Sequence, residues 1–510
     1  MTNLPHSELT HRRNVLFISL GGLGLYALTC APGVLWQDSG MFQYRVRYGD
    51  VPGIQGLPLA HPLYILLARA FAYIPLGSFA YRVNLFSVVC AAVALGVAAD
   101  LLWSLTRNRV AVACGALTLA VSHTFWMHAV IAEVYALYSL GLLVELWLIE
   151  RFIARRSAYW LILALLVNGL NLSNHLLAIL HWPMYAGLAI WAIRAGRLLP
   201  RSIPVLFVAL LAGSSPYLWL IGSRLAAGQP FAEVMKEALV GPPQRAKLVL
   251  THSFPFIKQV KNAFFYFTMN FPTPLALCAP IGAWAAWKQS TTQWFALVGG
   301  SLFVVGFAFA FRYLVPDQFV FYMPCYVLFA IFTGLGVAKL GRVTIWRPVV
   351  CVVLAALPAA VYEIAPGVLR SLNVAIGPSR EITYRDRYAY FILPRKNGYT
   401  GAGRFAREAL EAVMPDGLLY SDSTINNAVI YVRDVEGVGP GVTLAGAADI
   451  RPAEPTVQAN ADALEPFVRR EAAFATTAAK EYLPKWFKER YEVEPHGLVH
   501  RIVEKDVAGP

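Results

Sequence analysis

The chain has 510 residues, of which 57% are hydrophobic and only 14% are charged, with a mean hydropathy of +0.52. A soluble domain usually carries about a quarter charged residues because its surface meets water, so this composition excludes a cytosolic enzyme, a disordered chain and a simple nucleic-acid-binding protein. The net charge of +13 comes from residues 1–365, which hold 25 Lys and Arg but 11 Asp and Glu, whereas residues 366–510 hold 18 and 19. We predict an α-helical polytopic membrane domain over 1–365 and a polar domain over 366–510.

About eleven apolar stretches are long enough to be membrane-spanning helices, which need about 20 mostly apolar residues each. Lys and Arg collect in every second connection, and such basic loops mark the cytoplasmic side. The chain is therefore predicted to be a multi-pass protein of the plasma (inner) membrane, with a cytoplasmic amino terminus and an extracytoplasmic carboxyl-terminal domain. The predicted spans are 14–32, 81–105, 109–125, 128–150, 158–172, 176–193, 203–222, 263–287, 292–311, 318–338 and 347–365, with 61–75 as a further candidate.

The first predicted outer loop carries a candidate for acid–base chemistry. A Pro-Gly pair ends the first span, and Asp38 follows beside aromatic residues that suit the membrane interface. An apolar surrounding would raise the pKa of this carboxyl toward the range of a general base. The alternative is an ordinary turn in which Asp38 caps a helix over 41–48. His61, before Pro62, is either a second polar group of the site or a structural residue.

Residues 1–365 contain eleven acids, and each is expected to have a structural or functional role, because a charged side chain in or near a membrane span is energetically unfavourable. Glu133 is expected near the outer end of a helix over 128–150, where it either faces a cavity or pairs with Arg82. The acids expected toward the cytoplasmic side, paired with nearby Arg, are Glu8, Asp100, Glu145 and Glu150.

Two further polar clusters lie at predicted outer ends of spans. Asn174 and His175 connect the fifth and sixth spans, where they either cap both helices or bind a ligand. Arg312 and Asp317 precede and begin the tenth span, where they either hold a phosphate or a metal, or Arg312 only extends to the membrane interface. The sequence has no dense carboxylate cluster, and its six cysteines are typical of small apolar core residues, so we expect no metal and no cofactor.

Residues 366–510 have balanced charge and ordinary loop sequences, which predict a small α/β domain. We expect this domain to help bind an acceptor. Asp422, at the end of a predicted strand, is either a helix cap or a ligand-binding group. The predicted elements are an amphipathic helix within 399–414, a buried strand at 418–422, a helix or strand at 426–432, and a mostly helical stretch over 466–491.

Four of these segments together resemble one family of polytopic membrane glycosyltransferases with the GT-C fold. The family was formerly of unknown function, and its animal relative is an endoplasmic-reticulum protein O-mannosyltransferase. The resemblance covers about the first two-thirds of the chain and is strongest over residues 30–150. The segments that carry it are Ala31 to Tyr64, Arg82-Val83-Asn84-Leu85-Phe86-Ser87, Phe125-Trp126 to Tyr138, and Asp317-Gln318-Phe319 to Pro324.

The resemblance implies a transferase that moves a sugar (mannose or a similar one) from a polyprenyl-phosphate carrier to an acceptor hydroxyl at the outer face. It implies that Asp38, the acid of the first outer loop, is the base. Glu133 and Tyr135 match the family's Glu-Val-Tyr and would line the cavity, and His61 begins a shortened form of a longer family motif. The implied partners are a lipid-linked sugar donor, membrane lipids, and a protein, glycan or lipid acceptor.

The chemistry of such a transfer agrees with the residues available. The acceptor loses its proton as it attacks the anomeric carbon, a single displacement inverts the sugar, and the leaving phosphate needs a cation. The candidate cations are Arg45, Arg82 and Arg312. The alternatives are a lipid or small-molecule transporter or flippase, which usually shows internal repeats, and a non-catalytic envelope-assembly protein.

Overall fold

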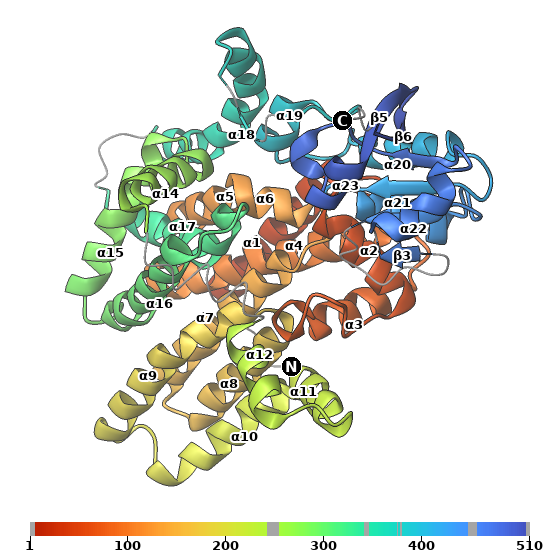
Figure 1. Cartoon of the computed structure of the whole chain (residues 1–510). Helices are drawn as coiled ribbons and strands as arrows, with labels where there is room; N and C mark the ends of the chain where they lie inside the picture. The colour runs from red at the N-terminus through yellow and green to blue at the C-terminus, as the bar shows by residue number, and fades with distance from the viewer. Residues whose placement is uncertain are drawn as a thin grey trace.

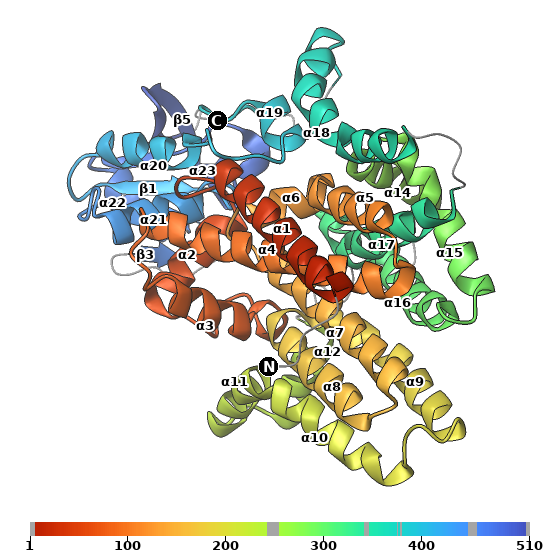
Figure 2. The ribbon, with the colours of Figure 1, turned by 180° about the vertical axis from the view of Figure 1, so that it is seen from behind.

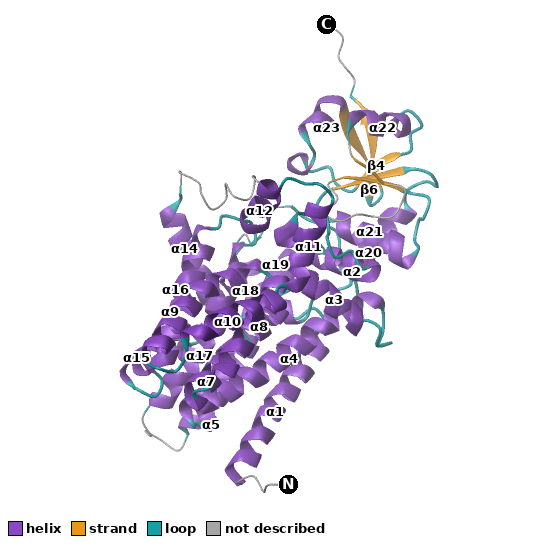
Figure 3. Ribbon diagram, turned by 90° about the horizontal axis from the view of Figure 1, so that it is seen from below, coloured by secondary structure: helices purple, strands orange, loops and turns teal. Residues whose placement is uncertain are grey.

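The structure is a computed structural model that describes residues 6–241, 254–340, 346–374, 376–377, 380–446, 456–458 and 460–505. It consists of a bundle of helices with a small sheet domain at one end (Figure 1). The amino-terminal end of α1 lies at the opposite end of the bundle from the sheet (Figure 3). The predicted combination of a helical membrane part with a small carboxyl-terminal α/β domain is therefore confirmed.

Helices cover almost all of the predicted spans, because the apolar stretches can satisfy their backbone groups internally only as helices. In this part α1 lies along α4 (Figure 2). The helices up to residue 371 are α1 His6–Thr29, α2 Asp38–Tyr48, η1 Leu57–Leu59, α3 Pro62–Phe71, α4 Phe79–Thr106, α5 Arg109–Ala120, α6 His123–Ala129, α7 Tyr135–Arg155, α8 Ala158–Asn174, η2 Leu176–His181, α9 Trp182–Arg194, η3 Pro200–Ser202, α10 Ile203–Gly213, α11 Ser215–Ala226, α12 Phe231–Val240, α14 Phe256–Asn270, η4 Pro274–Leu277, α15 Cys278–Lys288, α16 Gln293–Arg312, η5 Gln318–Tyr322, α17 Met323–Lys339 and α18 Arg347–Ser371.

The predicted number of about eleven spans is not confirmed. By length and composition, five helical stretches in the described ranges can cross a membrane, or seven if two bent helix pairs each count as one span. The pairs α5–α6 and α10–α11 bend by 68° and 73°. The predicted span 263–287 is divided among α14, η4 and α15. Pro216 lies in the first turn of α11 and Pro274 begins η4, and proline cannot continue a preceding helix without losing a backbone hydrogen bond.

The segment around Glu133 also differs from the prediction of one helix over 128–150. Helix α6 ends at Ala129, α7 begins at Tyr135, and residues 130–134 form a loop between them. Carbonyl oxygens of this loop accept hydrogen bonds from the amide of Ala31 (3.0 Å) and from the side chain of Asn174 (3.1 Å). These hydrogen bonds satisfy backbone carbonyls of the loop that have no partner within a helix. Glu133 is therefore carried by a loop that two neighbouring segments hold in place.

Close helix crossings rely on glycine. A Cβ at Gly213 of α10 would overlap the carbonyl oxygen of Leu166 on α8, and a Cβ at Gly282 of α15 would overlap the carbonyl oxygen of Phe332 on α17. Small residues allow such backbone contact between membrane helices. The six cysteines are free and buried, as predicted for small core residues.

Two of the acids predicted to pair with Arg do so. Asp100 and Glu150 lie 2.9 and 3.1 Å from Arg151. The side chain of Glu8 lies outside the described ones. Glu145 is different, because its side chain is only 1% exposed and its partner is His181, at 2.9 Å, rather than an Arg. The predicted pairing of Glu145 was wrong because the fold of α7 against α8 and η2 turns this side chain into the bundle.

The carboxyl-terminal part contains a six-stranded sheet in the order β3-β2-β1-β4-β6-β5. Strands β3, β2, β1 and β4 are parallel, and β6 pairs antiparallel with both β4 and β5. We call residues 380–399 the connecting segment and residues 401–505 the sheet domain. The elements are α19 Arg387–Ile392, α20 Gly401–Glu411, β1 Leu418–Ser421, α21 Asn426–Glu436, β2 Thr443–Gly446, β3 Thr456–Gln458, α22 Ala461–Val468, β4 Ala473–Ala475, η6 Lys480–Tyr482, α23 Lys485–Arg490, β5 Tyr491–His496 and β6 Val499–Glu504.

The predicted helix within 399–414 and the buried strand at 418–422 are confirmed as α20 and β1, and the 426–432 stretch is the start of α21. The prediction of a mostly helical 466–491 was wrong, because β4 lies inside it. This three-residue strand is fully buried beside β1. It is too short to show the alternating hydrophobic pattern of a strand, so its conformation follows from its pairing with β1. Helix α18 runs to Ser371, five residues beyond the predicted boundary at 366.

Candidate active site

A cavity of about 1190 Å³ opens where the helical bundle meets the connecting segment and the sheet domain. Its walls come from segments far apart in the sequence: the start of α2, the loop before α3, the 130–134 loop, η2, η5, the connecting segment, and the loop after β1. The cavity brings together six of the predicted site residues, namely Asp38, His61, Glu133, Tyr135, His175 and Asp317.

Three acids share this cavity. Asp38 is the first residue of α2, Asp317 precedes η5, and Glu133 lies in the 130–134 loop outside the spanning helices. Burial raises the pKa of Glu133 well above its usual value, and the nearby charges of Asp38 and Asp317 raise it further. A raised pKa favours the protonated form of the Glu133 carboxyl, which can donate a hydrogen bond.

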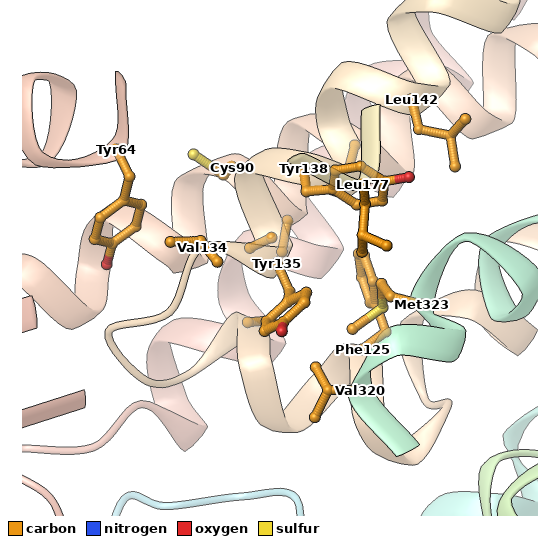
Figure 4. Packing of buried hydrophobic residues seen from close by; sticks show 14 of the residues in the cluster. Tyr64, Cys90, Phe125, Val134, Tyr135, Tyr138, Leu142, Leu177, Val320 and Met323 are labelled. Atoms are coloured by element: carbon orange, nitrogen blue, oxygen red, sulfur yellow. The ribbon is translucent and has the colours of Figure 1, made fainter. Parts of the chain in front are cut away.

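Aromatic and imidazole rings form one wall of the cavity. The ring centroid of His175 lies 5.2 Å from that of His61 and 5.3 Å from that of Tyr135. Tyr135 lies below Tyr138 at the start of α7, near Val320 on the neighbouring η5 helix (Figure 4). His61 has a positive φ of 48°, and its Nδ1 donates to the carbonyl oxygen of Asn174 at 2.6 Å. Planar rings that line a cavity in this way suit the flat, polar-edged surface of a sugar.

Asn174 lies behind this wall rather than in the cavity lining. It is fully buried, its side chain donates to the carbonyl of Val134 at 3.1 Å, and its own carbonyl accepts from His61. His175 both caps a helix and lines the cavity, because its Nδ1 accepts from the amide of Leu177 at the start of η2 at 3.1 Å. Asn174 joins the loop of Glu133 to the loop of His61.

The three arginines predicted to hold a phosphate lie outside the cavity lining. Arg45 is buried, and its guanidinium donates to four backbone carbonyls, including those of Asp50 (3.0 Å) and Ala60 (2.6 Å). Arg82 donates to the carbonyl of Ala72 at 2.7 Å rather than pairing with Glu133. Arg312 stacks over the ring of Phe254 at 4.3 Å. These contacts hold loops and helix ends, as buried polar groups require.

Two other cations do line the cavity. Lys396 is only 3% exposed, and its ammonium group donates to the carbonyls of Tyr390 (2.7 Å) and Leu393 (2.6 Å). Burial, and to a lesser degree the charge of Arg395, lowers the pKa of Lys396 to about 7. Arg385 is buried over the ring of Tyr390, and burial lowers its pKa too. Among the described residues neither cation has a carboxylate within 4 Å. Both are therefore available to an anion.

The sequence analysis missed these two cations because they follow the last span, in a stretch assigned to the outer domain. A signal was present: the stretch 384–399 mixes aromatic residues with Arg and Lys directly after an apolar helix. The connecting segment is tied back onto the bundle by hydrogen bonds from the amide of Lys396 to the carbonyl of Thr29 (2.8 Å) and from His123 to the carbonyl of Phe391 (2.9 Å). These long-range bonds bring the cations to the cavity.

Residues of the sheet domain complete the cavity rim. Ser423 and Thr424, in the loop after β1, line it together with Tyr482. Asp422 is buried in the same loop, where it pairs with Arg380 at 2.8 Å and accepts from the amide of Thr424 at 2.9 Å. Asp422 therefore holds the loop in place. No group of three or more metal-binding side chains occurs in the described ranges, and the absence of a metal requirement stays a prediction.

Comparisons with known proteins point to one fold. Residues 58–196 match the family model described as the protein O-mannosyl-transferase TMEM260 N-terminal domain. ArnT from Cupriavidus metallidurans in the apo state is similar with a TM-score of 0.60 and 14% identity, over 97% of this chain and 98% of that chain. The same protein bound to undecaprenyl phosphate gives a TM-score of 0.58 and 15% identity, over 97% and 99%. This chain has the GT-C fold.

A third GT-C structure, the archaeal oligosaccharyltransferase AglB from Archaeoglobus fulgidus in complex with an inhibitory peptide and a dolichol-phosphate, has a TM-score of 0.50 and 11% identity, over 99% of this chain and 75% of that chain. No curated protein matches the chain significantly. The resemblance drawn from the sequence is therefore confirmed: this is a multi-pass membrane protein with the GT-C glycosyltransferase fold, and its residues 58–196 match the O-mannosyltransferase family model.

Proposed function

We propose that this GT-C protein is a glycosyltransferase that moves a sugar, mannose or a similar one, from a polyprenyl-phosphate carrier to an acceptor hydroxyl. The observation that carries the proposal is the single cavity in which Asp38, Glu133 and Asp317 lie together with the cations Lys396 and Arg385. A glycosyl transfer needs a base for the acceptor and a cation for the leaving phosphate, and this cavity holds both kinds of group. The two most similar structures named above include one with undecaprenyl phosphate bound, which supports a lipid-linked donor.

In the proposed reaction the acceptor oxygen attacks the anomeric carbon of the donor. The bond between that carbon and the phosphate oxygen breaks, and polyprenyl phosphate leaves with the bonding electrons. Asp38 takes the acceptor proton, while Lys396 and Arg385 neutralise the phosphate. The protonated carboxyl of Glu133 donates a hydrogen bond to the sugar or the phosphate. A single displacement of this kind inverts the configuration of the sugar.

The apolar part of the cavity accounts for the carrier. Besides its polar groups, the cavity is lined by aliphatic and aromatic side chains of η2, α14, α16 and η5, among them Leu176, Leu180, Phe265, Phe309 and Phe321. Phe265 is more than half exposed on the outside of the bundle, where lipid chains would lie. We propose that the polyprenyl chain enters between these helices, and that the acceptor approaches from the sheet domain.

The proposed compartment follows from the same arrangement. The basic connections support a cytoplasmic amino terminus. Residues of the connecting segment and the sheet domain line the cavity, and the sheet lies at the other end of the bundle from the amino-terminal end of α1 (Figure 3). We propose that both the cavity and the sheet domain face outward from the plasma (inner) membrane. The partners would be a lipid-linked sugar and a protein, glycan or lipid acceptor.

The test is transfer of label by the purified protein. Polyprenyl-phosphate mannose, glucose or arabinose carrying a radiolabelled sugar is incubated with the protein and with membrane, glycan and protein fractions, and the label is followed. We expect transfer from one of these donors. The variant Asp38→Asn should fold normally and bind donor, but its kcat should fall by about 10²-fold to 10⁴-fold, the range that general-base catalysis supplies.

The same variant tests the alternatives. A transporter or flippase should move the intact lipid without breaking the bond to the sugar, and a non-catalytic assembly protein should be indifferent to Asp38→Asn. Wild-type protein that releases no polyprenyl phosphate from any of the three donors would contradict the proposed enzyme. As a control, Asp462→Asn changes an acid at the start of α22 in the sheet domain and should leave kcat unchanged.

A further inference from the structure

The residue directly before Asp38 is held by the sheet domain. Gln37 has a φ of 56° and a ψ of −135°, a backbone conformation that favours glycine. Its amide donates to the carbonyl oxygen of Thr424 at 3.2 Å, and its carbonyl oxygen accepts from the side-chain amide of Asn427 at 3.0 Å. Both polar groups of this strained peptide therefore bond to the loop after β1 and the start of α21.

Helix α21 also contacts α2 along its length. At the start of α2, a Cβ on Gly40 would lie 2.7 Å from the carbonyl oxygen of Leu35 and 3.3 Å from the backbone nitrogen of Ala428 on α21, so the two backbones are in close contact. At the end of α2, the hydroxyl of Tyr48 donates to the carbonyl of Asp434 at 3.0 Å. Asn427 itself is fully buried in this contact.

A strained backbone conformation persists only when its surroundings determine it. Without its two bonds, Gln37 would relax toward negative φ, and a change of φ at this position redirects the first turn of α2. Asp38 is the first residue of that turn and lines the cavity, so its carboxylate would move with it. The orientation of Asp38 thus depends on residues about 390 positions later in the chain.

We propose that Asn427 is a positioning residue for Asp38, and that the sheet domain is thereby part of the apparatus for proton transfer rather than only a binding surface for the acceptor. The proposal rests on the proposed function, because Asp38 must be the base for its orientation to matter. A displacement of a reacting group by about 1 Å can cost about 10²-fold in rate. Loss of Asn427 should therefore lower kcat and leave the donor KM almost unchanged.

Hydrolysis of the donor separates the two roles of the sheet domain. When water is the acceptor, its oxygen attacks the anomeric carbon, polyprenyl phosphate leaves, and Asp38 takes the water proton. This reaction uses the base but not the binding surface for the acceptor. A positioning role for Asn427 therefore affects hydrolysis and transfer alike, whereas a role in acceptor binding affects transfer alone.

The experiment compares Asn427→Ala with the wild type in the full-length protein, using the labelled donor that the wild type accepts. We expect kcat to fall by about 10²-fold for both hydrolysis and transfer. The control Asn460→Ala removes an asparagine of the same domain that caps α22, and it should leave both rates unchanged. Unchanged hydrolysis in Asn427→Ala would overturn the inference but not the proposed function. Absence of turnover in the wild type would overturn both.

A second pair of variants keeps the test decisive if Asn427→Ala does not fold. Asn427→Asp has the same shape but cannot donate to the carbonyl of Gln37 when ionised, and it should show the same fall in kcat. Adding Gln37→Gly should recover about tenfold of that loss, because glycine adopts positive φ without the bond. A merely structural role for Asn427 predicts no such recovery, and its absence would overturn the inference.

Discussion

At the scale of single residues, the cavity separates its titratable groups by their surroundings. Glu133 is buried beside two other acids, and its pKa rises, which favours its protonated form. Lys396 is buried without a carboxylate among the described residues within 4 Å, and its pKa falls to about 7. Groups whose pKa values are shifted from their ordinary values in this way are typical of sites for acid–base chemistry.

The first prediction at this scale concerns Lys396 and pH. Because its pKa is about 7, the side chain loses its proton as the pH rises through neutrality. Binding of the donor phosphate favours the protonated form, so the donor KM should be lowest below pH 7 and should rise above it. In Lys396→Met the KM should be raised by about tenfold at the lower pH, and this pH dependence should vanish.

Measurement of the donor KM at several pH values checks this prediction. Lys396→Arg should keep the low KM at alkaline pH, because arginine stays charged. The control Lys485→Met removes an exposed lysine of the sheet domain and should not alter the pH profile. A donor KM that rises with pH equally in Lys396→Met and the wild type would contradict the assignment.

At the scale of elements, a buried polar network holds the wall of the cavity. The carboxylate of Glu145 on α7 accepts from Asn168 of α8 (3.0 Å) and from Tyr185 of α9 (3.0 Å), and lies 2.9 Å from Nδ1 of His181 at the end of η2. The other ring nitrogen of His181 lies 3.0 Å from the hydroxyl of Tyr138. This network fixes η2, whose residues line the cavity.

The prediction for this network is a large loss of stability. Glu145→Ala leaves several buried polar groups unsatisfied and should lower the free energy of unfolding by about 3 kcal/mol. Glu145→Gln should cost less, because its amide oxygen still accepts from Asn168 and Tyr185. Thermal unfolding of the purified protein measures both, and Glu363→Ala, which breaks an exposed pair with Arg395, should cost about 1 kcal/mol or less. Equal costs for Glu145→Ala and Glu363→Ala would contradict the network's role.

At the scale of the whole molecule, the proposed catalytic cavity requires the bundle and the sheet domain together. Asp38 and Glu133 come from the first third of the chain, Asp317 from the middle, and Lys396 from the connecting segment. The sheet domain supplies the rim and supports α2. Removal of residues 380–510 should therefore abolish hydrolysis of the donor as well as transfer, which a role limited to binding the acceptor would not require.

The last prediction concerns the orientation of the molecule. All six native cysteines are buried, so the wild type should react little with a membrane-impermeant maleimide. Glu481→Cys, at an exposed position of the sheet domain, should be labelled in intact cells. Arg201→Cys, in a basic connection expected to be cytoplasmic, should be labelled only after the membrane is opened. The reverse pattern would place the cavity on the cytoplasmic side.

The sequence predicted the architecture well because composition and apolar length act locally. The helical bundle, the change of character near residue 366, the amphipathic α20 and the buried β1 all follow from patterns within about 20 residues. The bends in α5–α6 and α10–α11 and the short strand β4 do not, because they depend on what each segment packs against. The number of spans and the structure of 466–491 were therefore not predictable from local sequence, because both depend on contacts between segments far apart in the chain.

The sequence by itself determined that the chain is a membrane protein, because residues 1–365 carry few charges with a positive excess. The small number of acids there also reduced the candidate bases to a short set containing Asp38. Which cations face the cavity was decided only by the tertiary structure. Arg45 lies near Asp38 in sequence, yet it lies outside the cavity lining and donates to four backbone carbonyls, whereas Lys396, from beyond the last span, lines the cavity while two carbonyls accept from its ammonium group. The physical reason is that a buried cation must find acceptors wherever its segment lies, and only the complete fold shows which segments meet at the cavity.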